Sequence, residues 1–134
     1  MARARIDDEL GRAAVATVQA IMAKHGGSAG GAAIGASVDR STLALAVRYT
    51  LQLLAERAPG GTVEVRVPPH GAVQCVEGPK HTRGTPPNVI ETDAATWLAL
   101  AVGDLSWADA RAAGRVHASG QRADLDGLLP VIVV

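Results

Sequence analysis

The sequence predicts an α+β domain in which a small mixed or antiparallel sheet packs against helices. Two long segments in the first half repeat apolar residues every three or four positions, which is the spacing of one helix face. Three strand-like runs then follow one another without intervening helices, and such an order favours α+β over a regular parallel α/β sheet. Two short helices, one more strand and a last short helix complete the expected order.

The two long helices are expected on either side of a glycine-rich stretch. The first covers residues 6–25, with an apolar face formed by Ile6, Leu10, Ala14, Val18 and Ile21. Residues 26–35 lack both periodicity and bulk, which is typical of a flexible connection. Asp39 or Ser41 can cap the second helix, which runs to about Arg57 and is apolar on two faces. We therefore expect this second helix to be largely buried.

The clearest strand is the run TVEVRVP at residues 62–68. Glu64 and Arg66 alternate in this run with a set of valines, Val63, Val65 and Val67. Because successive side chains of a strand point to opposite faces, we expect the valines in the core and the two charged residues towards solvent. The Pro-Pro pair that follows indicates either an edge strand or the end of the strand. Residues 71–77 and 88–92 predict two further strands with weaker alternation.

Capping residues divide the next part of the chain into two helices. Thr92 or Asp93 can cap a helix that closes at Gly103, where a left-handed residue is expected. Ser106 begins a shorter helix in the manner of a capping box, and Gly114 ends it.

The C-terminal residues predict a strand, a helix and a tail. Residues 115–119 are expected to form the last strand, and residues 123–129 a short helix. Asp124 and Asp126 suit the cap and first turn of that helix, so we do not interpret them as a catalytic pair of carboxylates. The tail at residues 130–134 is apolar throughout.

The amino-acid composition indicates which kinds of partner the protein can bind and in which cellular compartment it is expected. Thirteen basic residues balance thirteen acidic ones, so the broad positive field that nucleic-acid binding requires is missing. The single cysteine, Cys75, excludes an intramolecular disulfide and fits a reducing compartment. Acidic residues 7–9 stand where a signal peptide needs apolar ones, and no apolar run reaches the length of a membrane span. We expect a soluble cytoplasmic protein without a nucleic-acid partner or membrane insertion.

Residues 91–132 contain helix-capping residues, apolar residues and glycines in a regular order. The positions that define this order are Asp93, Leu98, Gly103, Ser106, Ala110, Gly114, Val116, Gly120 and Leu125. This succession resembles the C-terminal half of the sterol-carrier-protein domain family. Residues 65–93 are similar to the short, free-standing bacterial sterol-carrier-like proteins in particular. The resemblance extends over roughly residues 40–132. It suggests an N-terminal helix and Gly-rich linker at residues 1–38 and a sterol-carrier-like domain at residues 39–134, within one compact domain overall.

The resemblance implies a sheet of four to five strands covered on one side by helices, with an apolar cavity between the two. Such a cavity binds acyl chains, sterols or other lipids. The resemblance supplies no catalytic residues, no cofactor and no metal. The side chains expected to contact the ligand are apolar ones from the helices, the strands and the C-terminal segment, namely Leu51, Leu54, Val63, Val65, Val73, Trp97, Leu98, Leu125 and Leu128.

A basic loop at residues 78–87 joins two of the predicted strands. It carries Lys80, His81 and Arg83 in a backbone that glycine and proline restrict. The three side chains could converge on a phosphate or carboxylate, and we count them as candidate contacts for the head group of a ligand. The alternative is a solvated turn with ordinary surface charges.

Two classes of function fit these residues. The first is a non-catalytic carrier whose affinity comes from buried apolar area. The second is a structural or protein-interaction module on the same fold with a collapsed core. An enzyme fits less well because no nucleophile has a base at a recognisable spacing, and Cys75 with His70 and His81 does not have the paired spacing of a zinc site.

The tail should be buried either by its own domain or by a second copy of the chain in a homo-oligomer.

Overall fold

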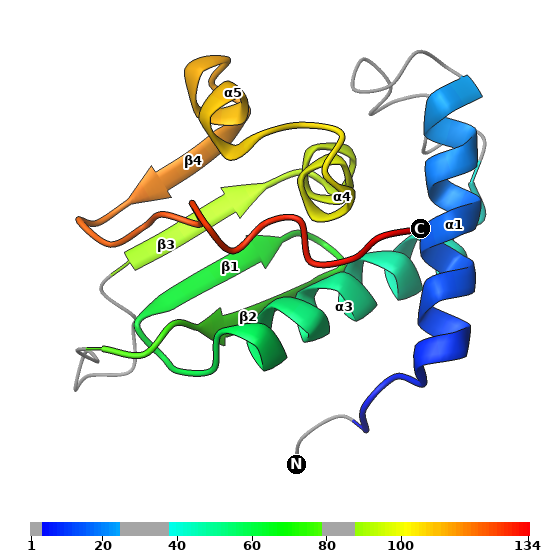
Figure 1. Cartoon of the computed structure of the whole chain (residues 1–134), viewed down its shortest axis with the longest axis horizontal. Helices are drawn as coiled ribbons and strands as arrows, with labels where there is room; N and C mark the ends of the chain where they lie inside the picture. Colours follow the sequence, from blue (N-terminus) through cyan, green and yellow to red (C-terminus); the bar gives the residue numbers. More distant parts are fainter. Residues whose placement is uncertain (1–3, 25–37, 79–87) are drawn as a thin grey trace.

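The computed structural model describes residues 4–24, 38–78 and 88–134, and it confirms the predicted α+β class. The two long helices, the two shorter helices and the four strands lie where the sequence predicts them (Figure 1). In chain order the elements are α1 (Asp8–Lys24), α3 (Arg40–Arg57), β1 (Val63–Val67), β2 (Gly71–Cys75), β3 (Asn88–Thr92), α4 (Ala94–Val102), α5 (Trp107–Ala112) and β4 (Val116–Ser119).

The four strands of the described residues form one mixed sheet in the order β2-β1-β3-β4. β1 pairs antiparallel with β2 and parallel with β3, and β3 pairs antiparallel with β4. Val65 stands opposite Val73 on one side and opposite Ile90 on the other. Partners in a ladder share a face of the sheet, so this row of apolar side chains points to one side. Every valine of β1 is fully buried, which confirms the predicted alternation.

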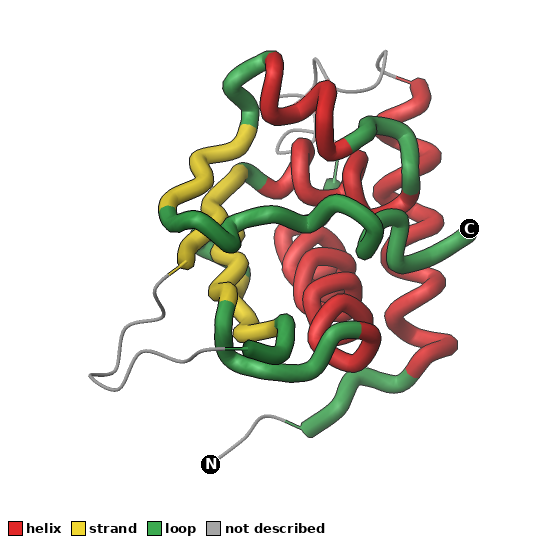
Figure 2. The backbone as a smooth tube through the Cα atoms, turned by 60° about the vertical axis from the view of Figure 1, so that its left-hand side comes forward, coloured by secondary structure: helices red, strands yellow, loops and turns green. Residues whose placement is uncertain are grey.

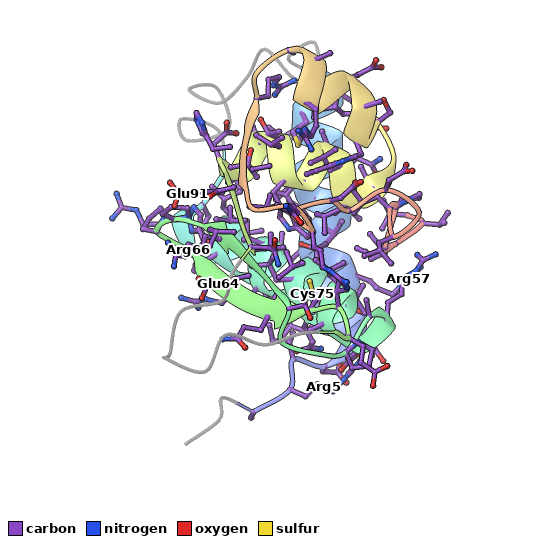
Figure 3. The ribbon with its side chains drawn as sticks, turned by 90° about the vertical axis from the view of Figure 1, so that its left-hand side faces the viewer. Arg5, Arg57, Glu64, Arg66, Cys75 and Glu91 are labelled. Atoms are coloured by element: carbon purple, nitrogen blue, oxygen red, sulfur yellow. The ribbon has the colours of Figure 1, made fainter. Side chains whose placement is uncertain are left out.

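Helices cover one face of the sheet, as Figure 2 shows. α3 packs along β2 and against α4, while α1 packs on α3. The core therefore lies between the sheet and the pair formed by α3 and α4. Glu64 and Arg66 point to the opposite face, where Figure 3 shows them near Glu91. An amphipathic sheet with one packed and one solvated face is what the alternation in β1 predicts.

The contact between α1 and α3 depends on a glycine. A Cβ atom at Gly11 would overlap the ring of Tyr49, so the two helices approach closely only because position 11 has no side chain. The Tyr49 hydroxyl donates a hydrogen bond of 2.7 Å to Asp8, and this bond is the largest cause that lowers the pKa of the Asp8 carboxyl. The prediction that Leu10 lies on the buried face was wrong. Leu10 is 56% exposed because the face that meets α3 is built around Gly11 and Val15.

The predicted helix caps are confirmed. Asp93 caps α4 and Ser106 caps α5, each through a side-chain oxygen that accepts a hydrogen bond from a backbone N–H. α4 ends at Gly103, whose φ of 89° lies in the left-handed region that glycine adopts without strain. For α3 the cap is Asp39 rather than Ser41, since Asp39 accepts from the backbone N–H of Ser41. The helix boundaries thus follow from local side-chain chemistry.

The short helix predicted at residues 123–129 does not form, and that prediction was wrong. The carboxylate of Asp124 accepts a hydrogen bond of 2.9 Å from the backbone N–H of Asp126, which closes a turn instead of capping a helix. Gly127 then adopts a φ of 83°, in the left-handed region that interrupts a right-handed helix. The chain therefore turns at residues 126–128 and continues without regular secondary structure.

Candidate functional site

Most of the side chains predicted to contact a ligand lie in the packed core between the sheet and the helices. Seven of the nine apolar candidates are at most 2% exposed, namely Leu51, Leu54, Val63, Val65, Trp97, Leu98 and Leu125. The indole of Trp97 is fixed there, because its Nε1–H donates a hydrogen bond of 2.8 Å to the hydroxyl of Thr50. A ligand held between the sheet and the helices would have to displace these contacts, which the dense packing of a core opposes.

The C-terminal segment, residues 121–134, forms part of this core. It crosses the helical side of the molecule from β4 towards α1 (Figures 1 and 2). Leu125 is fully buried and Ile132 is 4% exposed. The backbone N–H groups of Val131 and Ile132 donate to the carbonyl of Ala101 at 2.9 and 3.3 Å. Leu128 packs against the same core and is partly buried, so this segment closes the helical side over the sheet.

Beyond Ile132 the tail turns outward. Val133 is 77% exposed and Val134 is 47% exposed. The carbonyl of Val133 accepts a hydrogen bond of 2.7 Å from the guanidinium of Arg12, which holds the end of the chain beside α1. The prediction that the tail is buried against its own domain is therefore right for Ile132 and partly right for the half-buried Val131, and it is wrong for Pro130 and the last two residues. Burial of these two valines by a second copy of the chain stays a prediction.

A groove of about 330 Å³ lies at the edge of the sheet formed by β2. Its walls are the residues before α1, one face of α3 and the turn that leads into β2. The lining residues are Ala4, Ile6, Arg48, Leu51, Gln52, His70, Gly71, Ala72 and Val73. Leu51 and Val73 belong to the predicted set of contacts, and the other described residues of that set do not line this groove. Five of the nine lining residues carry purely apolar side chains, so the groove suits an apolar ligand.

The wall contributed by the N-terminal residues is held to α3 by two sets of hydrogen bonds. The side chain of Gln52 accepts from the backbone N–H of Ile6 at 2.8 Å and donates to the carbonyl of Ile6 at 3.0 Å. Arg5 donates two hydrogen bonds to Glu56, at 2.6 and 2.9 Å. The hydrogen bond from Arg5 is also the largest cause that lowers the pKa of Glu56. The residues before α1 are thus fixed to the C-terminal half of α3.

One end of the groove is cationic. Arg48 lies there on α3 and donates a hydrogen bond of 2.9 Å from its Nε to the carbonyl of His70. Burial, followed by the charges of Arg48 and Arg40, lowers the pKa of the His70 imidazole. The neutral form of His70 is therefore favoured at neutral pH. Among the described residues that line the groove, none is an aspartate or a glutamate.

A second hollow, of about 500 Å³, lies on the outward face of the sheet over β3 and β4. It is lined by Val89, Glu91, Arg111, Val116, His117, Ala118 and Ser119. Nearby, Arg66 donates a hydrogen bond of 2.6 Å to Glu64 on the same face (Figure 3). Charged side chains that face water offer little apolar area to a ligand. We therefore take the groove beside β2, and not this hollow, as the candidate site.

Cys75 does not line the groove. It is fully buried, and desolvation raises the pKa of its thiol to about 11, so the reactive thiolate is scarce at neutral pH. This burial indicates a structural cysteine. Within residues 4–24, 38–78 and 88–134, no three His, Cys, Asp or Glu side chains could hold a metal ion, and no helix could cross a membrane. Lys80, His81 and Arg83 lie outside the described residues.

The polar residues of the groove were not predicted from the sequence, although one signal for them exists. Arg48 and Gln52 are four positions apart on a helix that is otherwise apolar on two faces, so they lie on the same side of it. Two polar side chains on one side of a largely buried helix indicate that this side contacts polar groups of another part of the chain or a ligand. The contribution of Ile6 has no comparable signal, because it depends on a hydrogen bond between residues 46 positions apart.

One comparison with known proteins gives a match. The model of a family described as bacterial SCP ortholog matches residues 39–131, which is more than half of the chain. No curated protein matches. The matched range begins at the residue that caps α3 and extends into the C-terminal segment, so it contains the α3 and β2 walls of the groove. The wall formed by Ala4 and Ile6 lies before it.

Proposed function

Because this chain belongs to the family of bacterial SCP orthologues, which is sterol-carrier-protein-like, we propose that it binds a lipid or another apolar small molecule and carries it unchanged. The observation that carries the proposal is the groove beside β2, an apolar-lined hollow whose volume of about 330 Å³ is within the range of ligand sites. The ligand lies along Ile6, Leu51 and Val73. The packed core beneath them, with Val65 and Leu54, forms the floor that supports the site.

The apolar lining sets how affinity depends on the ligand. Each methylene group that the groove takes out of water contributes about 0.8 kcal/mol. This amount corresponds to roughly a fourfold decrease in Kd for each added methylene. Affinity should therefore rise regularly along a series of saturated chains and level off once the chain is longer than the groove. A carrier needs no reacting group, and the buried thiol of Cys75 supports this non-catalytic role.

The packed interior favours one alternative, a protein-interaction module with a collapsed core. Trp97, Val63 and Leu125 have no exposed surface, so the space in which a cavity between helices and sheet was expected is occupied by side chains. In that case the groove would be a surface irregularity, and the exposed end of the tail would contact a partner protein. The two functions differ in whether any apolar molecule binds.

Native mass spectrometry of the purified protein, before and after organic extraction, tests the proposal. A bound lipid that extraction removes, followed by rebinding of a fluorescent fatty acid, is the expected result. The variant Gly71→Val tests the location. A Cβ atom at Gly71 would lie 3.6 Å from both Leu51 and Arg48, an ordinary contact distance. A valine there should fill the groove without strain in the backbone.

Gly71→Val should lower the affinity for the fatty acid by about tenfold or more and leave the melting temperature within a few degrees of wild type. The matched control is Ser119→Val, a β-branched substitution at an exposed position of β4 away from the groove. Equal affinity in Gly71→Val and wild type would place the ligand elsewhere. Absence of any co-purified or added lipid would instead favour the interaction module.

A further inference from the structure

We propose that Arg48 makes the groove selective for ligands that carry an anionic head group, a carboxylate or a phosphate, at the end of an apolar chain. This inference rests on the proposed function, since it concerns the same groove. It adds a specific residue and a charge requirement, neither of which follows from an apolar lining alone. The position of Arg48, its hydrogen bond to the carbonyl of His70 and the charges around it carry the proposal.

The guanidinium of Arg48 is held in place but not neutralised. Its Nε–H donates to the carbonyl of His70 at 2.9 Å, which fixes the side chain between α3 and the turn into β2. The two terminal nitrogens carry further N–H groups, and within residues 4–24, 38–78 and 88–134 no acceptor hydrogen-bonds to them. A guanidinium cannot lose its proton at physiological pH, so the charge persists. The head of the side chain is thus available to an acceptor from outside the chain.

No aspartate or glutamate competes for Arg48 among the described residues that line the groove. Among its described partners in the wall of the groove, Gln52 is engaged on both sides of its amide by the backbone of Ile6. His70 contributes a ring that burial keeps towards its neutral form. Arg5 and Arg66 differ in this respect, because Arg5 pairs with Glu56 and Arg66 pairs with Glu64. Arg48 is a half-buried cation beside apolar side chains, and an anion at this point would be only partly screened by water.

The guanidinium of Arg48 is chemically complementary to a carboxylate or a phosphate. The planar fork of a guanidinium matches the two oxygens of a carboxylate or of a phosphate and can donate two parallel hydrogen bonds. An acyl chain attached to that head group would run from Arg48 along Leu51 and Val73, residues that line the same groove. A neutral head group, such as an ester or an alcohol, gains no charge-assisted hydrogen bond. Arg48 is therefore a specificity-determining residue, while the apolar walls bind the chain of either kind of ligand.

The experiment compares three ligands of equal chain length, decanoate, decyl phosphate and methyl decanoate, by titration calorimetry below their critical micelle concentrations. The proteins are wild type, Arg48→Met and Arg111→Met. Methionine keeps the apolar stem of arginine and removes the charge. Arg111→Met is the matched control, because Arg111 is an exposed arginine of α5 away from the groove. The melting temperature of each variant is measured alongside.

Wild type is expected to bind the anionic ligands roughly 10-fold to 100-fold more tightly than the ester. Arg48→Met should bind the anions only as tightly as the ester and should bind the ester as wild type does. Arg111→Met should behave as wild type. Tighter binding of decanoate than of decyl phosphate would identify a carboxylate as the preferred head group, and the reverse order would identify a phosphate.

Equal binding of acid and ester by wild type would overturn the charge requirement and leave the carrier function standing. An equal loss of affinity for the acid and the ester in a folded Arg48→Met variant would also overturn the charge requirement and leave the carrier function standing. Failure of all three ligands to bind wild type would overturn the carrier function itself. If Arg48→Met does not fold, salt decides the question with wild type alone. Raising NaCl from about 0.05 M to about 1 M should weaken anion binding several-fold and leave ester binding unchanged, and equal effects would refute the inference.

Discussion

Replacing Ile132 with alanine tests whether the C-terminal segment is part of the core. Ile132 is 4% exposed, and its backbone N–H donates to the carbonyl of Ala101 at the end of α4. The substitution removes a few carbon atoms from a buried side chain, at about 0.8 kcal/mol for each methylene-sized group. With the cost of the remaining cavity, the free energy of unfolding should fall by about 2–5 kcal/mol. The melting temperature should then fall by roughly 10 °C for a chain of this size.

The neighbouring residue supplies the control. Val133 is 77% exposed, so Val133→Ala should change the free energy of unfolding by no more than about 0.5 kcal/mol. Urea denaturation followed by circular dichroism measures both variants, and an unchanged m-value would show that the change lies in the folded state. If Ile132→Ala is as stable as Val133→Ala to within about 0.5 kcal/mol, the segment does not belong to the core and the reasoning is refuted.

Two further predictions concern polar groups in and beside the core. The hydrogen bond from Trp97 to Thr50 should appear as a coupling of at least about 0.5 kcal/mol in a double-mutant cycle of Trp97→Phe and Thr50→Val, and additive effects would contradict it. The stability of the fold should also depend on the protonation of His70, because burial lowers the pKa of its imidazole in the folded state below the ordinary 6.5. The contribution of neutral His70 to the free energy of unfolding is therefore fully present above pH 6.5 and is lost as the pH falls through the lowered pKa. The free energy of unfolding should decline less between about pH 7 and pH 5 in His70→Gln than in wild type or in the exposed control His117→Gln, and an unchanged decline would exclude His70 as the cause.

Local signals in the sequence predicted most of the fold. The alternation in β1 places Val63, Val65 and Val67 in the core because the period of a strand admits only one inward face. Asp93 and Gly103 mark the beginning and end of α4 through interactions within a few residues of the chain. The same local reasoning failed at residues 123–129. There Asp124 has the chemistry of a helix cap and also of a turn, and the left-handed Gly127 ends any helix before its second turn.

Features that depend on distant contacts could not be predicted. Leu10 looks like part of an apolar helix face, but the helix is rotated because Gly11 must face the ring of Tyr49. The groove likewise requires the residues before α1 to return to α3, where Gln52 binds the backbone of Ile6. The expected cavity between sheet and helices could not be distinguished from a packed core by composition. The space is filled partly because the C-terminal segment returns to the helices and places Ile132 against the core.

Photo-crosslinking with a diazirine-bearing fatty acid, followed by peptide mass spectrometry, shows directly where the ligand binds. The groove is formed by three separate parts of the chain, so we expect labels on residues 4–6, 48–52 and 70–73. Excess unlabelled decanoate should abolish these labels. Labels confined to residues 63–65 or 97–98 would show that the ligand enters the core between the sheet and the helices, and they would contradict the groove as the binding site.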